Sequence, residues 1–140
     1  MIHQRRNYHV NYINYFKSQA KKLYKDFQTQ YIAENDSIYS YKPQFWQDIE
    51  EIILSFDIDE DNFSLMKAQH IVAYLANFKN WHELIHANDY QLELGYYLVE
   101  FREDNLVEDW KMYERHNKLK SVDDESKLDI FKHVFLETDN

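Results

Sequence analysis

The sequence has no cysteine, one glycine and one proline in 140 residues. Without cysteine, the chain can form neither a disulfide framework nor a thiolate site. A β-sandwich or β-barrel needs many tight turns, and those turns favour glycine, proline and Asn-Gly pairs. The scarcity of both turn residues therefore argues against these all-β folds and predicts an all-α protein.

Long apolar runs are also missing. No window approaches about 18 consecutive apolar residues, the length needed to cross a membrane as a helix. The first ten residues, MIHQRRNYHV, lack the apolar centre of a secretory signal. We therefore expect no membrane association and a cytoplasmic location. A chain of this length can bury a substantial core, and we expect residues 1–140 to form a single helical domain.

Aromatic residues are abundant, and they recur at helical spacing. The chain contains twelve Tyr, nine Phe and three Trp. The first expected helix runs from about Tyr8 to Ala33. Further apolar periods predict helices that begin near Pro43, Ser64, Trp81, Asn88 and Leu106, and a last one that contains Leu128. The short connections favour a compact bundle of about six or seven helices packed as neighbours.

Polar residues at the expected helix ends predict three caps. Ser64 or Asn62 can accept a backbone N–H at the start of the third helix. Asn77 tolerates the left-handed backbone conformation, so the third helix should stop there. Asn88 can cap the fifth helix, because Gln91 follows three residues later, as a capping box requires.

The net charge of −9 is unevenly distributed. The first 25 residues contain no acidic residue. They hold six basic ones, which are Arg5, Arg6, Lys17, Lys21, Lys22 and Lys25. We expect this helix to pair with the acidic remainder of the chain. The alternative is that the basic N-terminal helix binds nucleic acid, with its Tyr rings stacked on bases. A chain this acidic repels phosphate, so we do not expect nucleic acid as the partner.

The segment 82–86, HELIH, matches the H-E-x-x-H pattern of zinc metallopeptidases. His82 and His86 lie four residues apart, so both imidazoles can reach one Zn²⁺ from the same face of a helix. Glu83 would then activate the metal-bound water as general base. A small zinc-dependent hydrolase is therefore one alternative function, with zinc as its cofactor.

The zinc interpretation requires a third ligand. The long metzincin form would place Gly and His where Asp89 and Leu92 stand, so that form is excluded. A gluzincin would take a Glu from a later helix, and the candidates are Glu93, Glu100, Glu103 and Glu108. His70 on the preceding helix is the other possible third ligand. The competing interpretation is a short surface helix that buries its apolar residues and turns both histidines and Glu83 to water.

Residues 64–88 resemble a helical-pair pattern of small bacterial proteins, S-L-x-x-A-Q-x-x-I/V-A-x-x-x-G-F-x-x-W-x-x-L. The matching residues are Ser64, Leu65, Ala68, Gln69, Val72, Ala73, Phe78, Trp81 and Leu84. Asn77 stands where the pattern has Gly, and Asn is the next-best residue for that conformation. The resemblance implies two helices joined by a tight turn, with positions 82 and 86 on the surface, and it implies no activity.

The sequence favours binding over catalysis. Tyr and Trp make good contact anchors, and an acidic surface suits a protein partner that carries a basic patch. We predict a non-catalytic helical protein-interaction module, in the class of inhibitor or antidote proteins of bacterial or phage origin, without a cofactor. For the basic helix, the candidate interaction residues are Arg5, Arg6, Lys17, Lys21 and Lys25.

Overall fold

The computed structural model describes residues 2–137, with side chains from residue 12 onward. The described chain forms seven α-helices, which are α1 Ile2–Phe27, α2 Ile49–Phe56, α3 Leu65–Leu75, α4 Trp81–Ile85, α5 Asp89–Glu100, α6 Leu106–His116 and α7 Asp124–Phe131. Short turns follow the last three helices, at Arg102–Asp104, Leu119–Ser121 and, in π-helical form, Lys132–Leu136. The predicted all-α class and the helix number are confirmed. None of the described helices is long and apolar enough to cross a membrane.

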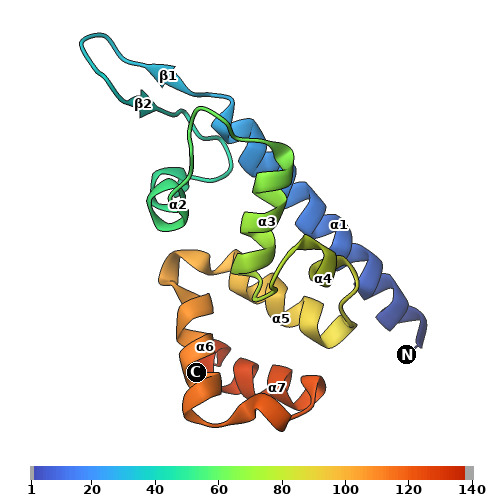
Figure 1. Ribbon diagram of the computed structural model, residues 1–140. Coiled ribbons are helices and arrows are strands. Elements are labelled where there is room, and N and C mark those ends of the chain that lie inside the picture. The colour runs from blue at the N-terminus through green and yellow to red at the C-terminus, as the bar shows by residue number, and fades with distance from the viewer. Residues whose placement is uncertain (1, 138–140) are drawn as a thin grey trace.

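Helix α1 is the longest element and forms one side of the bundle (Figure 1). Helices α3 and α5 pack against it, and α7 packs against α5. Phe16, Ala20 and Leu23 are fully buried at helical spacing along α1. Trp110 and Phe131 are equally buried between α6 and α7, with ring centroids 5.3 Å apart. The core therefore continues from α1 through α5 to the C-terminal helices.

Tyrosine side chains pack their rings on this core and direct hydroxyls toward carboxylates. Examples among the described residues are Tyr15–Glu100, Tyr39–Asp61, Tyr41–Glu60, Tyr74–Glu108 and Tyr97–Glu93. Burial, together with the Glu100 carboxylate, raises the pKa of the Tyr15 hydroxyl above its usual value. Most of these bonds join elements far apart in sequence, so part of the acidic excess serves the fold.

Helix α1 ends at Phe27, before the predicted end at Ala33. The Thr29 hydroxyl donates to the Asp26 backbone carbonyl at 2.6 Å and satisfies the last turn. The chain then leaves the helix, so Tyr31 lies on a strand and not on the predicted helical face. The aromatic periodicity continued past the true end because Tyr also suits a strand.

The segment from Pro43 to Trp46 is a turn held against α1, not the first turn of a helix. Asp26 is fully buried on α1, and its carboxylate accepts the backbone N–H groups of Gln44, Phe45 and Trp46 at 2.9, 2.9 and 2.5 Å. These N–H groups are held by a distant side chain. Helix α2 therefore begins at Ile49, and the prediction that it starts at Pro43 is wrong.

The three predicted caps are confirmed. The Ser64 hydroxyl accepts the Lys67 N–H at 3.2 Å and begins α3. Asn77 has φ 71°, in the left-handed region, directly after α3. Asn88 and Gln91 form the reciprocal bonds of a capping box at the start of α5. Local side-chain chemistry thus sets these helix boundaries.

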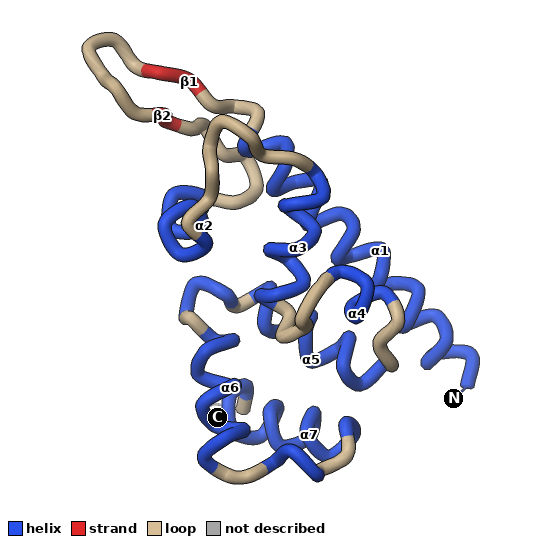
Figure 2. Tube along the Cα trace, in the orientation of Figure 1, coloured by secondary structure: helices blue, strands red, loops and turns tan. Residues whose placement is uncertain are grey.

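Strands β1 (Tyr31–Ile32) and β2 (Tyr39–Ser40) pair antiparallel. They form a hairpin, residues 31–40, that projects from the helical body and that we call the arm (Figures 1 and 2). The sequence predicted a loop over residues 34–42 and no strand. Strands of two residues are too short to show alternation, so pattern reasoning could not detect them.

Candidate functional site

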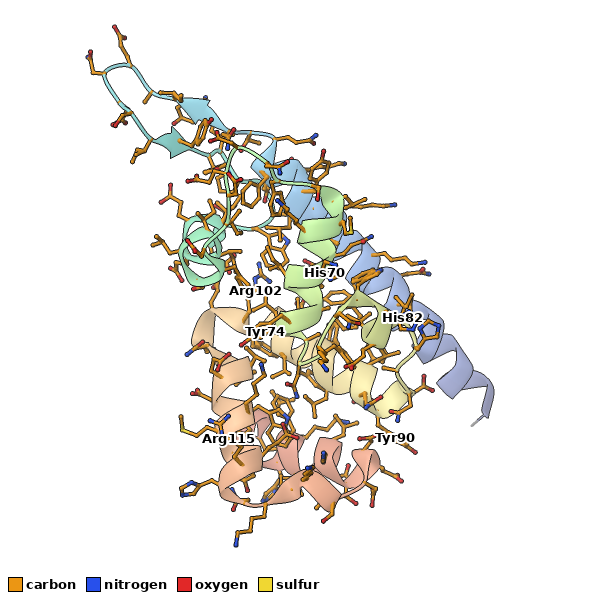
Figure 3. The ribbon with its side chains drawn as sticks, viewed as in Figure 1. His70, Tyr74, His82, Tyr90, Arg102 and Arg115 are labelled. Carbon is orange, nitrogen blue, oxygen red and sulfur yellow. The ribbon has the colours of Figure 1, made fainter. Side chains whose placement is uncertain are left out.

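Helix α4 carries the HELIH motif and is anchored by its apolar residues. Asn80 caps it by accepting the Glu83 N–H at 2.9 Å. Leu84 is fully buried, while His82 and His86 are exposed. Figure 3 labels His82 on α4. The two imidazole centroids lie 4.3 Å apart, and His86 Nδ1 is hydrogen-bonded to the His82 carbonyl at 2.9 Å. The predicted proximity of the two histidines is present.

Glu83 has a different environment from the two histidines. Its Oε1 accepts the Lys79 backbone N–H at 3.2 Å, so the side chain turns back over the start of α4. It also lines a cavity whose lining includes neither His82 nor His86. Glu83 therefore acts as a helix-start acceptor here, and its carboxylate is turned toward the Lys79 N–H and not toward a water bound between the two imidazoles.

The proposed third zinc ligands are placed as follows. His70 is exposed on α3 (Figure 3). Glu93 on α5 forms an ion pair with Lys132, with Nζ 2.7 Å from Oε2. The same oxygen accepts a hydrogen bond from the Tyr97 hydroxyl at 3.2 Å. Its carboxylate is thus engaged with the turn after α7. Across residues 12–137, no group of three or more His, Asp or Glu side chains lies close enough to hold a metal ion.

The cavity beside Glu83 has a volume of about 140 Å³ and lies among the α3–α4 turn, α5, α6 and α7. Its polar wall is formed by Asn77, Glu83, Gln91, Glu114, Asp124 and Lys127. Lys127 Nζ lies 3.5 Å from Glu114 Oε2, and the Asn88 amide donates to Asp124 at 2.7 Å. Because a water molecule occupies about 30 Å³, this space suits a few waters and is too small for an extended substrate.

The basic stripe of α1 is exposed. Among the described residues, Lys17, Lys21 and Lys25 make no ion pair, so the predicted pairing with the acidic remainder is wrong for these three side chains. Lys22 instead lies over the Phe45 ring, 5.2 Å from its centroid. Arg5 and Arg6, the other candidate interaction residues, lie outside the residues whose side chains are described.

The arm carries three exposed apolar side chains. Tyr31, Ile32 and Ile38 are 41%, 57% and 67% exposed. Lys42 Nζ lies 5.1 Å from the Tyr31 ring centroid and covers part of that ring. Apolar side chains left exposed together on a projecting segment are candidates for a contact site. Sequence reasoning missed it because it assigned Tyr31 to a helix and residues 34–42 to a loop.

The base of the arm is fixed to the loop 57–61. The Tyr39 hydroxyl donates to Asp61, and the Tyr41 hydroxyl donates to Glu60 at 2.6 Å. Gln30 Nε2 donates to the Glu60 carbonyl at 2.9 Å. Further carboxylates on the arm and this loop are those of Glu34, Asp36, Asp57 and Asp59, which lie at exposed positions. The arm and the loop together therefore carry exposed apolar side chains and exposed carboxylates.

No family model, curated protein or solved structure matches this chain. Its function is therefore inferred from its own residues and their arrangement.

Proposed function

We propose that this protein is a non-catalytic protein-interaction module whose contact surface is the arm and the acidic loop 57–61. The observation that carries this proposal is the exposure of Tyr31, Ile32 and Ile38 on a projecting hairpin. A two-stranded hairpin is marginally stable in water when nothing packs on it. A partner that covers these side chains supplies that packing and removes their apolar surface from water.

The charge around the arm defines the partner's chemistry. Glu34 and Asp36 flank Asn35, which has φ 69° at the tip, and loop 57–61 adds further carboxylates beside the base. A partner with an apolar groove bordered by Lys or Arg complements this surface, and opposite charges speed the encounter. An inhibitor or antidote protein of bacterial or phage origin that covers a basic functional surface is the class in which we place this chain.

Site-specific crosslinking tests the proposal. A photoreactive residue at position 38 identifies the protein that the arm contacts in the cells that produce this chain. The same residue at position 54 is the matched control, because Leu54 is 82% exposed on α2, outside the arm. We expect a specific adduct from position 38 only.

The captured partner then has to bind in purified form. Its affinity for this protein should fall as salt concentration rises, because charge complementarity contributes to the encounter. A partner that crosslinks equally from positions 38 and 54, or one whose binding surface is acidic, would overturn the assignment of the arm.

A further inference from the structure

An open groove of about 970 Å³ runs along the end of α6, the turn Leu119–Ser121 and α7. Its charged lining consists of five basic residues and one acidic residue, which are Lys111, Arg115, Lys118, Lys120, Lys127 and Glu114. A groove with this excess of positive charge is unexpected in a chain whose net charge is −9. The sequence did not reveal it, because its residues come from two helices and the turn between them.

The carboxylate in the groove is already neutralised. Lys127 Nζ lies 3.5 Å from Glu114 Oε2, and Lys111 Nζ lies over the Tyr74 ring, 3.8 Å from its centroid. Arg115, Lys118 and Lys120 are exposed and make no ion pair with a described residue (Figure 3 labels Arg115 on α6). Three cations therefore remain free to meet an anion.

Lys118 is held in a conformation that its residue type disfavours. Five described residues other than glycine have positive φ, and four of them are Asn35, Asp57, Asn77 and Asn105. Asn and Asp tolerate the left-handed region, whereas a longer side chain suffers a steric cost there. Lys118 is the fifth, with φ 54°, at the position after the α6 C-cap where Gly or Asn is favoured. Retained strain of this kind concentrates at functional positions.

We propose that this groove binds an acidic segment of a partner protein. The free cations complement Asp and Glu side chains, and the open shape accepts an extended chain. No aromatic side chain lines the groove, so bases have nothing to stack on. The net charge of −9 also repels a nucleic acid, which is charged along its whole length, more than it repels a short acidic peptide.

The groove is separate from the surface proposed above. The arm and the α6–α7 pair lie at opposite ends of the molecule (Figure 1). Binding in the groove is therefore expected to be independent of the arm. An Ile32→Ser/Ile38→Ser variant should bind an acidic peptide as the unaltered protein does, and loss of that binding would contradict the separation of the two surfaces.

Fluorescence anisotropy with a fluorescein-labelled oligo-glutamate peptide tests the groove in the full chain. We expect salt-sensitive binding that Arg115→Glu/Lys120→Glu weakens by about tenfold or more. The matched control is Lys67→Glu/Lys79→Glu, which changes the net charge equally at exposed lysines outside the groove. Absence of binding by the unaltered protein, or an equal loss in the control, overturns the proposal.

Lys118→Asn separates the role of the groove from stability. It should raise Tm by about 2–4 °C, because Asn relieves the left-handed strain, and it should weaken peptide binding several-fold. Unchanged peptide binding by this variant would overturn the role of Lys118. Tighter binding of labelled single-stranded DNA than of the peptide would overturn the acidic segment as occupant. Self-association in sedimentation velocity would also overturn that occupant if Arg115→Glu/Lys120→Glu abolished it, because the groove would then bind a second copy of this chain.

Discussion

The buried carboxylate of Asp26 accepts the backbone N–H of Trp46 at 2.5 Å and so joins the end of α1 to the segment before α2. Between these two residues the chain leaves the helical body, forms the arm and returns. The Asp26 side chain therefore helps to close the loop that presents the proposed contact surface, together with Thr29, which accepts the Lys42 N–H at 2.9 Å. Charged acceptors form the stronger class of hydrogen bonds, which suits a single residue that holds three N–H groups.

Replacing Asp26 with Asn should destabilise the fold by about 3 kcal/mol. The amide carries no charge, and its NH₂ group would face N–H donors, so buried donors would lose their acceptors. Urea unfolding measures the change. Asp36→Asn, at the exposed tip of the arm, is the matched control and should stay within about 0.5 kcal/mol. Equal effects at the two positions would show that the buried contacts carry little of the stability.

The one glycine in the chain, Gly95, lies inside α5 where that helix meets the end of α3. A Cβ at this position would lie 3.0 Å from both the Cβ and the carbonyl oxygen of Ala76. Gly95→Ala gains about 1 kcal/mol in helix propensity, but crowding against backbone costs about 1–3 kcal/mol. We expect a net loss of about 1 kcal/mol in urea unfolding. A gain in stability would mean that the two helices can separate slightly without cost.

The fold should lose stability in alkali. Burial and a neighbouring carboxylate raise the pKa of Tyr15 and of Tyr41 in the folded protein. Unfolded tyrosine titrates near pH 10. Below that pH both tyrosines are protonated in the folded and the unfolded state, and their contribution to the free energy of unfolding is fully present. Above it the unfolded state loses protons first, so the free energy of unfolding falls as pH rises.

Urea unfolding between pH 8 and 11 measures this decline. Tyr15→Phe should cost about 1.5 kcal/mol at pH 7, since it removes a hydrogen bond to a charged acceptor, and it should make the alkaline decline shallower. If Tyr15→Phe and Tyr41→Phe lose stability between pH 8 and 11 as steeply as the unaltered protein does, other titrating groups cause the decline.

The HELIH motif should behave as a surface helix. Glu83→Ala should cost about 1 kcal/mol because it removes the acceptor of the Lys79 N–H. His82→Ala and His86→Ala should stay within about 0.5 kcal/mol. Elemental analysis should find no stoichiometric zinc, and a chelator should leave Tm unchanged. Stoichiometric zinc that disappears in His82→Ala would instead support the hydrolase.

Helix ends that are set by a side chain bonded to nearby backbone groups were predictable from the sequence. Ser64, Asn77 and Asn88 each act on backbone groups within a few positions, so sequence spacing sufficed to place those helix ends. The start of α2 was not predictable in this way. It follows from bonds between Asp26 and N–H groups about twenty residues later, and nothing local signals such a pairing.

In the candidate functional surfaces, too, local spacing was predictable and contacts between separate segments were not. Helical spacing predicted that the imidazoles of His82 and His86 would be close, but the direction of Glu83 depends on the Lys79 N–H. The arm escaped prediction because its strands are two residues long. The basic groove escaped because Arg115, Lys120 and Lys127 have no common period and meet only when α6 and α7 fold together.

The central claim, that the arm is the contact surface of an interaction module, is tested most directly by one affinity comparison. The Kd of the purified partner is measured for the unaltered protein, for Ile32→Ser/Ile38→Ser and for Leu54→Ser, with far-UV circular dichroism to confirm that each variant is folded. We predict a loss of about a hundredfold for the arm variant, because buried apolar anchors dominate interfaces, and no change for Leu54→Ser. Equal Kd values for all three proteins would contradict the claim.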